Sequence, residues 1–236
     1  MITDRIDAIT RIPEAYQHAT LPAPKSVKIE ISPRCNYRCG FCALRNREVQ
    51  PKWDMDLNLF KRITREMRDA GVEEIGVFYL GESFMAPKLL VDCIRYLKQE
   101  IGMPYVFLTS NGSMAFPEAV EACMAAGLDS LKWSCNAADE DQFEEIMGVS
   151  KKLFHRAYEN VRDAWEIRER GGYKTGLYAS SIQYDGAQQA LMESLINEKV
   201  VPYVDQHYWL PLYSMGAFAT QREEELGYKP TAGNQG

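Results

Sequence analysis

Hydrophobic and polar positions along this chain follow two patterns that alternate with each other. Short runs rich in β-branched and aromatic residues are followed by longer stretches in which apolar residues recur every three or four positions. The first pattern is typical of strands and the second of amphipathic helices, and their alternation predicts a parallel sheet with crossover helices. Six strands are expected, at 26–31, 74–80, 105–109, 130–134, 174–182 and 200–209.

Five helices are expected in the gaps between these strands. The first covers about 55–70, and Gly71 is well placed to end it. The third begins with Pro117, a favourable residue for a first turn, and ends at Gly127. The other helices are marked by the stripe Leu90, Ile94 and Leu97, by the stripe Leu153, Ala157, Val161 and Ala164, and by the stretch 187–197.

Six βα units in succession predict an α/β fold, an open and partial (βα)6 barrel of the TIM type. We expect an N-terminal extension at 1–24, the barrel at 25–217 and a tail at 218–236. In parallel βα folds the ligand lies at the carboxyl ends of the strands, so the residues directly after each strand are the candidates for chemistry.

Composition is that of one soluble enzyme domain. The chain has 236 residues, of which 46% are apolar, and its formal charge is -6. This charge and the absence of a Lys/Arg block argue against a general nucleic-acid or membrane surface. Asp4, Arg5 and Asp7 stand where a secretory signal would be apolar, and no transmembrane run is present. We therefore expect a cytoplasmic protein.

Three cysteines directly after the first strand carry the strongest chemical signal. Cys35, Cys39 and Cys42 form a CxxxCxxC pattern in one short loop. On a 4Fe-4S cluster three ligands would leave one iron open to a substrate or cofactor. Structural zinc usually takes four protein ligands, and a disulfide would leave one thiol over, so both alternatives fit the trio less well.

With the aromatic Phe41 before Cys42, this loop resembles the CxxxCxΦC signature of the radical S-adenosylmethionine (SAM) superfamily. The resemblance implies that the three cysteines hold a 4Fe-4S cluster and that SAM chelates its free iron. It also implies reductive cleavage of SAM to methionine and a 5′-deoxyadenosyl radical, which abstracts hydrogen from a substrate. The superfamily fold is the same (βα)6 shape.

The loop after the second strand contains Gly81, Glu82 and Ser83. A glycine allows close backbone approach and a carboxylate can take an ammonium group, although such a pair is also common in ordinary turns. The resemblance points to the superfamily's GGE motif, which implies contact with the SAM amino group. Leu80 replaces the first glycine of that motif.

Polar residues also follow the third and fourth strands. They include Asn111, Ser134 and Asn136. Asn and Ser are also common in ordinary turns and helix caps, so these residues alone do not indicate a binding site. The resemblance implies cofactor contacts, with Ser134 and Asn136 at the SAM ribose. It also suggests that Arg156 pairs with the SAM carboxylate, whereas a solvated helix arginine is the ordinary interpretation.

Two further residues are weak candidates for catalysis. Cys135 lies at a strand end, where a thiol could relay or quench a radical, and His207 lies in the sixth strand. Each could equally be a packing residue, and the strand pattern does not say which face points inward. Cys93 and Cys123 fall on apolar helix stripes and are expected in the core.

The overall pattern is most similar to radical SAM proteins whose core is followed by a SPASM or twitch domain, and a truncated or minimal single-domain member is expected. The leading hypothesis is hydrogen abstraction from a peptide, natural product or other small molecule, with a flavodoxin- or ferredoxin-type electron donor. The alternatives are a glycyl-radical enzyme activating enzyme and a non-catalytic cluster-binding or regulatory protein.

Overall fold

A computed structural model describes residues 14, 17, 19–46, 51–184, 186–214 and 232–233. Its main feature is a six-stranded, wholly parallel sheet in the order β1-β2-β3-β4-β5-β6. Because strand order follows chain order, each strand is joined to its neighbour by a crossover, as the βα alternation predicts. The strands are β1 (Ser26–Lys28), β2 (Glu74–Gly76), β3 (Tyr105–Ser110), β4 (Ser130–Ser134), β5 (Gly176–Ile182) and β6 (Gln206–Leu210).

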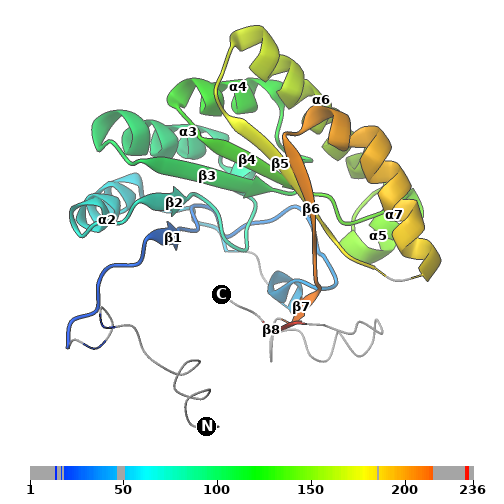
Figure 1. Ribbon diagram of the computed structural model, residues 1–236, viewed down its shortest axis with the longest axis horizontal. Coiled ribbons are helices and arrows are strands. Elements are labelled where there is room, and N and C mark those ends of the chain that lie inside the picture. Colours follow the sequence, from blue (N-terminus) through cyan, green and yellow to red (C-terminus); the bar gives the residue numbers. More distant parts are fainter. Residues whose placement is uncertain are drawn as a thin grey trace, which may run out of the picture.

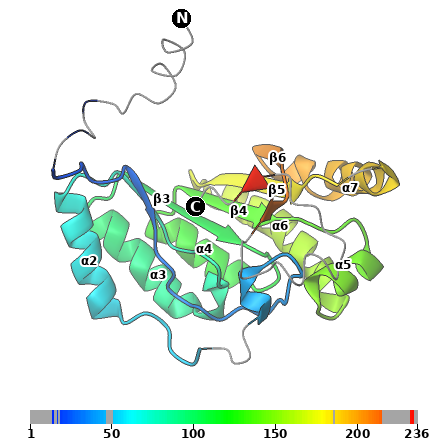
Figure 2. The same ribbon diagram turned by 90° about the horizontal axis from the view of Figure 1, so that it is seen from below.

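The main helices line one side of the curved sheet, which leaves its other side open (Figures 1 and 2). They are α2 (Leu57–Asp69), α3 (Pro87–Arg95), α4 (Pro117–Ala126), α5 (Glu140–Met147), α6 (Lys152–Gly171) and α7 (Gly186–Lys199). Shorter turns are η2 (Ala43–Asn46), η3 (Ser83–Met85), the π-helical η4 (Tyr96–Glu100) and η5 (Val201–Tyr203), and β7 (Tyr213–Ser214) pairs in parallel with β8 (Ala232–Gly233). The predicted partial (βα)6 barrel is confirmed.

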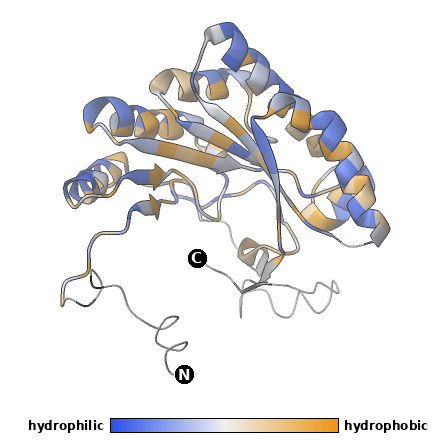
Figure 3. Cartoon of the chain, in the orientation of Figure 1, coloured by the Kyte–Doolittle hydropathy of each residue, from blue (hydrophilic) through white to orange (hydrophobic). Residues whose placement is uncertain are grey.

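Alternation along the strands separates a helix-covered face from a concave face. In β3, Val106 and Leu108 are buried, whereas the alternating residues Tyr105 and Phe107 are more exposed. Successive side chains of a strand point to opposite faces, so the first pair packs under the helices and the second lies on the concave face. The apolar residues in the middle of the sheet are visible in Figure 3. Trp133 of β4 is the largest fully buried side chain of the helix-covered face.

The helices begin and end where their local sequence dictates. The Asp56 carboxylate accepts a hydrogen bond from the Leu59 N–H and so caps α2. Gly127 ends α4 in the left-handed conformation, with φ of 103°, that a glycine adopts without steric cost. Both ends were expected from the sequence within two or three residues.

The first two strands are shorter than the predicted 26–31 and 74–80. The backbone leaves the ladder after Lys28 and Gly76 and turns into the loops of the candidate site. The sixth strand also starts later than predicted, because 201–203 form a helical turn that includes Pro202. α5 was not expected at all.

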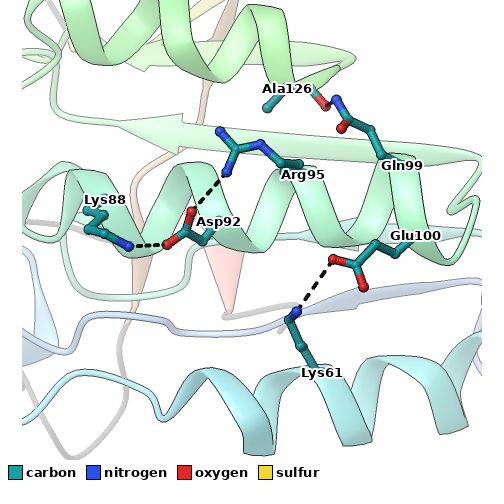
Figure 4. Close-up of polar contacts among 7 residues, drawn as sticks. All are labelled: Lys61, Lys88, Asp92, Arg95, Gln99, Glu100 and Ala126. Atoms are coloured by element: carbon teal, nitrogen blue, oxygen red, sulfur yellow. Dashed lines mark hydrogen bonds and ion pairs between the residues drawn. The ribbon is translucent and has the colours of Figure 1, made fainter.

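One ion pair links two of the outer helical segments, and two more lie within α3 (Figure 4). Lys61 of α2 reaches Glu100 of η4 at 3.4 Å, and Asp92 of α3 pairs with Lys88 at 2.6 Å and with Arg95 at 2.9 Å. Such exposed pairs contribute little to stability, so the apolar core between sheet and helices holds the fold together.

Most of the predicted extension at 1–24 and of the predicted tail at 218–236 lies outside the described residues. Within the described ranges, none of the helices is both long and apolar enough to cross a lipid bilayer.

Candidate cofactor site

The candidate site is built around the loop of residues 32–42, which we call the cysteine loop. It follows β1 at the carboxyl edge of the sheet, where parallel βα folds hold their ligands. Cys35, Cys39 and Cys42 are partly exposed, and none of the three forms a disulfide. The three predicted cluster ligands therefore lie at the accessible edge of the barrel.

Helix α5 holds one side of the cysteine loop. The N–H groups of Arg38 and Gly40 donate to the carbonyls of Met147 and Ile146 at 2.9 and 2.8 Å. Tyr37 packs edge-on against Phe143, with ring centroids 5.3 Å apart. The rest of this small apolar cluster consists of Ala137, Ile146, Met147 and Phe154, against which Cys35, Cys39 and Phe41 pack. Phe41 thus lies against α5 beside the cysteines.

This helix was missed, although its signals are present in the sequence. Asp139 caps its first turn by accepting from the Gln142 N–H, and Gly148 ends it with φ of 63°. Phe143, Ile146 and Met147 supply its buried face. An Asp cap, an apolar stripe and a closing glycine are ordinary helix signals, but eight residues are a short stretch on which to see a period.

A salt bridge fixes the start of the cysteine loop. Asp54 accepts hydrogen bonds from Arg34 at 2.6 and 3.1 Å and from the Ser32 hydroxyl at 2.7 Å. Arg34 also donates to the Met85 carbonyl at 3.1 Å. The start of the loop is therefore tied both to the segment before α2 and to η3.

Gly81 packs directly on the cysteine loop. A Cβ at this position would lie 2.0 Å from the Ser32 carbonyl oxygen and 3.0 Å from that of Arg34. The N–H of the next residue, Glu82, donates to the Arg34 carbonyl at 2.8 Å. The close backbone approach predicted for Gly81 therefore exists, and its partner in this structure is the chain's own cysteine loop.

Glu30, which sequence reasoning missed, holds the loop that contains Gly81, which we call the Gly81 loop. Its carboxylate accepts hydrogen bonds from the N–H groups of Leu80 and Gly81 at 3.0 and 2.8 Å. Adjacent N–H groups that point at one carboxylate fix the loop backbone. A lone acid at the end of a strand carries no sequence signal for this role.

Glu82 is turned into the protein. Its side chain is buried, and its oxygens accept from the Asn111 N–H at 2.8 Å, the Phe84 N–H at 3.0 Å and the Ser110 hydroxyl at 3.1 Å. Burial raises the pKa of this carboxyl, and these hydrogen bonds oppose the rise. Glu82 was expected to bind the SAM ammonium group, but in this structure its carboxylate is already hydrogen-bonded to groups of its own chain.

Ser83 is buried as well. Its hydroxyl donates to the Val77 carbonyl at 2.7 Å, inside the turn that leads into η3. This position makes Ser83 part of the loop's internal scaffold, away from the surface on which a cofactor contact was predicted.

Asn111 lies beside the first cysteine. Its side-chain N–H donates to Cys35 Sγ at 3.9 Å and to Asn36 Oδ1 at 2.9 Å. Its own Oδ1 accepts from the backbone N–H and the hydroxyl of Ser113, whose Oγ in turn accepts from Asn36. A closed polar ring thus places an amide N–H against a candidate cluster ligand.

Ser134 is the last residue of β4 and lies on the concave face, whereas Asn136 lies two residues beyond the strand. Ser134 pairs in register with Ser180 of β5. Asn136 accepts from the Ile182 N–H at 3.0 Å through its side chain, and its backbone carbonyl accepts from the Tyr184 hydroxyl at 2.7 Å. Asn136 therefore joins the carboxyl ends of β4 and β5. Ser134, for which a contact with the SAM ribose was expected, faces the open side.

Arg156 is exposed on α6. Its guanidinium stacks over the Phe116 ring, 5.5 Å from the centroid. Phe116 precedes α4, so this contact joins two neighbouring outer helices. The described contacts of Arg156 are those of the solvated helix arginine that was the ordinary interpretation.

Cys135 and His207 both lie on the helix-covered face of the sheet. Cys135 continues the buried series of Leu131 and Trp133, and burial raises the pKa of its thiol to about 12. His207 contacts the buried Ser181 hydroxyl at 3.0 Å and the Trp209 ring. Neither weak catalytic candidate faces the concave side, because strand alternation directs both away from it. Cys93 and Cys123 are fully buried, as predicted.

The concave face carries a cavity of about 300 Å³ lined by strands β1 to β6. None of the candidate site residues expected from the sequence lines this cavity. Lys132 of β4 lies in it, two residues before Ser134 on the same face, and its ammonium is 5.8 Å from the centroid of the Tyr208 ring. The cavity continues the concave surface from the predicted cofactor positions toward the middle of the strands.

The chemistry of the cysteine loop fits an iron-sulfur cluster. Burial raises the pKa of the Cys35 thiol to about 11 and the Tyr37 N–H lowers it, so metal binding must displace a proton there. Among the described residues no three His, Cys, Asp or Glu side chains gather as a single-ion site requires. A cluster makes a different demand, because each thiolate binds a different iron atom. Three soft thiolates with an amide N–H beside one of them are a suitable donor set.

Comparison with known proteins agrees with this geometry. The family model described as "Radical SAM superfamily" matches residues 29–175, more than half of the 236 residues. The S-adenosylmethionine-dependent nucleotide dehydratase RSAD2 of Danio rerio is 33% identical over 139 residues, which cover 58% of this chain and 37% of that protein. The GTP 3',8-cyclase of Mannheimia succiniciproducens is 28% identical over 147 residues, covering 60% and 41%.

Among solved structures, Streptococcus suis SuiB bound to S-adenosylmethionine superposes with a TM-score of 0.66 at 18% identity, covering 93% of this chain and 52% of SuiB. This likeness shows the shared fold. The chain thus matches about two fifths of the length of these curated relatives and about half of SuiB. By its cysteine loop, its parallel partial barrel and the family match, the chain belongs to the radical SAM superfamily, whose members use a 4Fe-4S cluster and SAM.

Proposed function

We propose that this protein is an enzyme that begins its reaction by reductive cleavage of SAM and abstracts a hydrogen atom from a substrate bound on the concave face. The observation that carries the proposal is the cysteine loop. Three cysteine thiols lie at the carboxyl edge of β1, and three separate parts of the chain hold their loop in place.

The chain's own residues supply the binding site. Cys35, Cys39 and Cys42 hold the cluster, and the backbone around Gly81 together with Ser134 borders the SAM site. When bound, the cluster and SAM supply an electron and a 5′-deoxyadenosyl radical, while the protein orients the reacting atoms and excludes water. Glu82 and Glu30 act on the backbone of the Gly81 loop, which they hold in place.

The reaction partners follow from this chemistry. A single-electron donor of the flavodoxin or ferredoxin type delivers the electron, and the labile cluster favours a reducing compartment such as the cytoplasm. The substrate is a small molecule or a peptide. The names of the relatives cover both classes, since RSAD2 is a nucleotide dehydratase and SuiB has been crystallised with the precursor peptide SuiA.

Metal content tests the ligand assignment directly. After anaerobic reconstitution with iron and sulfide, we expect about four iron atoms per wild-type chain and the broad visible absorption of a 4Fe-4S cluster. The Cys39→Ala variant should lose that absorption. The Cys123→Ala variant is the matched control, because this thiol is fully buried under the sheet and its loss should reduce stability while leaving the iron in place. A full cluster in Cys39→Ala, or an equal loss in Cys123→Ala, would contradict the assignment.

A further inference from the structure

The cavity on the concave face is lined by a lysine side chain, Lys132, that has no role in the proposed cofactor site. The ammonium group of Lys132 projects from the middle of β4 and contacts the Tyr208 ring. No salt bridge joins Lys132 to a carboxylate within the part of the chain that the structure describes. Burial lowers the pKa of this ammonium group, because desolvation disfavours its charged form.

The acid that lines the same cavity is too far away to neutralise this charge. Glu74 lies on β2, two strands from β4, and the register pairs it with Tyr105, whereas Lys132 pairs with Thr109. Four residues along β3 span about 13 Å, and two strand spacings add about 10 Å across the sheet. A partly buried cation without an anion close to it is unfavourable, and a bound anion would relieve that cost.

Aromatic rings form the surface around this cation. Phe107, Tyr178 and Tyr208 line the cavity together with Lys132. Gly76 and Gly176 make room for two of them, since a Cβ on Gly76 would meet the Phe107 ring at 2.9 Å and a Cβ on Gly176 the Tyr178 ring at 2.8 Å. The sheet is thus shaped to let flat rings lie along its concave face, where they can pack on an apolar or planar part of a ligand.

Depth separates this site from the predicted SAM contacts. Lys132 precedes Ser134 by two residues on the same face, which places it about 7 Å further from the carboxyl edge. The cysteine loop and Gly81 lie at that edge. A group bound at Lys132 would therefore lie deeper on the concave face than the predicted SAM contacts, where a substrate can bind beside them.

We propose that Lys132 binds an anionic group of the substrate, a phosphate or a carboxylate, and that the Phe107, Tyr178 and Tyr208 rings pack on the rest of the same molecule. This inference rests on the proposed function and specifies its substrate class. A phosphate attached to a planar base matches both features of the cavity, and the curated relatives with nucleotide-related names agree with that chemistry.

Equilibrium binding to the reconstituted full chain tests this assignment without any turnover. Four probes are titrated by calorimetry at fixed ionic strength: GTP, inorganic tripolyphosphate, glutarate and guanosine. The variants are Lys132→Met, which removes the charge, and Lys132→Arg, which keeps it. Lys88→Met is the matched control, since Lys88 is exposed on α3 and pairs only with Asp92 among the described residues. Thermal unfolding establishes that each variant is folded.

We expect the anions to bind at least about tenfold more weakly to Lys132→Met than to wild type, with most of the affinity kept in Lys132→Arg and all of it in Lys88→Met. Guanosine carries no charge and should bind both proteins alike. An effect confined to GTP and tripolyphosphate assigns a phosphate, and an effect confined to glutarate assigns a carboxylate.

Equal affinity of every anion for wild type and Lys132→Met overturns the proposal, as does a folded wild-type protein that binds none of them. Because no SAM is present in these titrations, a failure of SAM cleavage would count against the proposed function and leave the binding result standing.

Discussion

Single residues around the cysteine loop are fixed by contacts within the protein, and Gly81 has the tightest of them. A side chain at this position would collide with the Ser32 carbonyl. The residue thus contributes to the cofactor site through packing between two loops, whatever contact its backbone also makes with SAM. The same holds for Glu82, whose buried carboxylate joins the Gly81 loop to the end of β3.

The Gly81→Ala variant should assemble little cluster, because the added Cβ displaces the backbone that leads into Cys35. We expect a loss of at least about 2 kcal/mol in unfolding free energy, in the range of overpacked sites. Iron content and thermal unfolding measure both effects. Gly102→Ala is the control: Gly102 has a left-handed backbone, with φ of 61°, so alanine is strained there, but the added Cβ would meet no atom within 4 Å. Normal iron content in Gly81→Ala would show that the loops can separate without harm.

Asn111 tests the influence of the polar ring on the cluster. Its N–H points at Cys35 Sγ, and hydrogen bonds to cluster sulfurs raise the reduction potential by stabilising the more negative, reduced state. Asn111→Ala should therefore shift the potential of the reconstituted cluster to more negative values, as followed by a redox titration with electron paramagnetic resonance. Ser113→Ala opens the same ring but keeps the contact with sulfur, so its shift should be smaller. An unchanged reduction potential in Asn111→Ala would show that this residue does not influence the cluster.

At the scale of elements, the fold depends on how successive βα units are joined, and β5 and β6 show this well. Asp205, directly before β6, accepts hydrogen bonds from Arg168 of α6 at 2.7 and 2.8 Å and from the Leu177 N–H of β5 at 2.7 Å. One carboxylate thus links a helix and two strands at the amino edge of the sheet.

Asp205→Asn should destabilise the protein by about 1–2 kcal/mol at neutral pH, a value reduced for the partial exposure of the pair. Burial tends to raise the pKa of Asp205, but the bonds from Arg168 and Leu177 lower it overall. The carboxylate's contribution is therefore complete above its ordinary pKa of 3.8 and disappears as the pH falls through the lower folded value.

Denaturant unfolding at pH 7 and near pH 3 would measure this difference. Asp163→Asn on the same helix is the control, because its described partner is the neighbouring, largely exposed Arg162 and its loss should cost less than about 0.5 kcal/mol. A penalty for Asp205→Asn that stays the same at both pH values would contradict the assigned role.

Most elements were predictable because each strand and helix has its own local period. β4 coincides with its predicted bounds, and α2 and α4 lie within two or three residues of theirs. α5 was missed because a helix of eight residues shows barely two turns of its period. β2 was predicted too long, since the chain after it turns into a loop whose Leu80 and Gly81 N–H groups bond to Glu30 instead of a neighbouring strand. β1 was also predicted too long, and the Ile31 carbonyl after it accepts from the Met55 N–H, which is not part of a strand.

At the scale of the whole molecule, the cysteine ligands could be predicted and the surrounding contacts could not. The spacing of Cys35, Cys39 and Cys42 is local in the sequence, whereas the burial of Glu82 depends on Ser110 and Asn111 of the next βα unit. The direction of Cys135 and His207 depends on which strand face the helices cover. The cavity at Lys132 arises from six strands together, so no short motif announces it.

Reductive cleavage of SAM by the assembled barrel can be tested by following its product. The reconstituted protein is reduced with dithionite in the presence of SAM, without oxygen, and 5′-deoxyadenosine is followed by chromatography. The proposed cleavage requires that wild type and Cys123→Ala form deoxyadenosine and that Cys39→Ala does not. An intact 4Fe-4S cluster that binds SAM yet yields no deoxyadenosine with any suitable reductant or candidate substrate would contradict it, and would leave a cluster-binding protein without this activity.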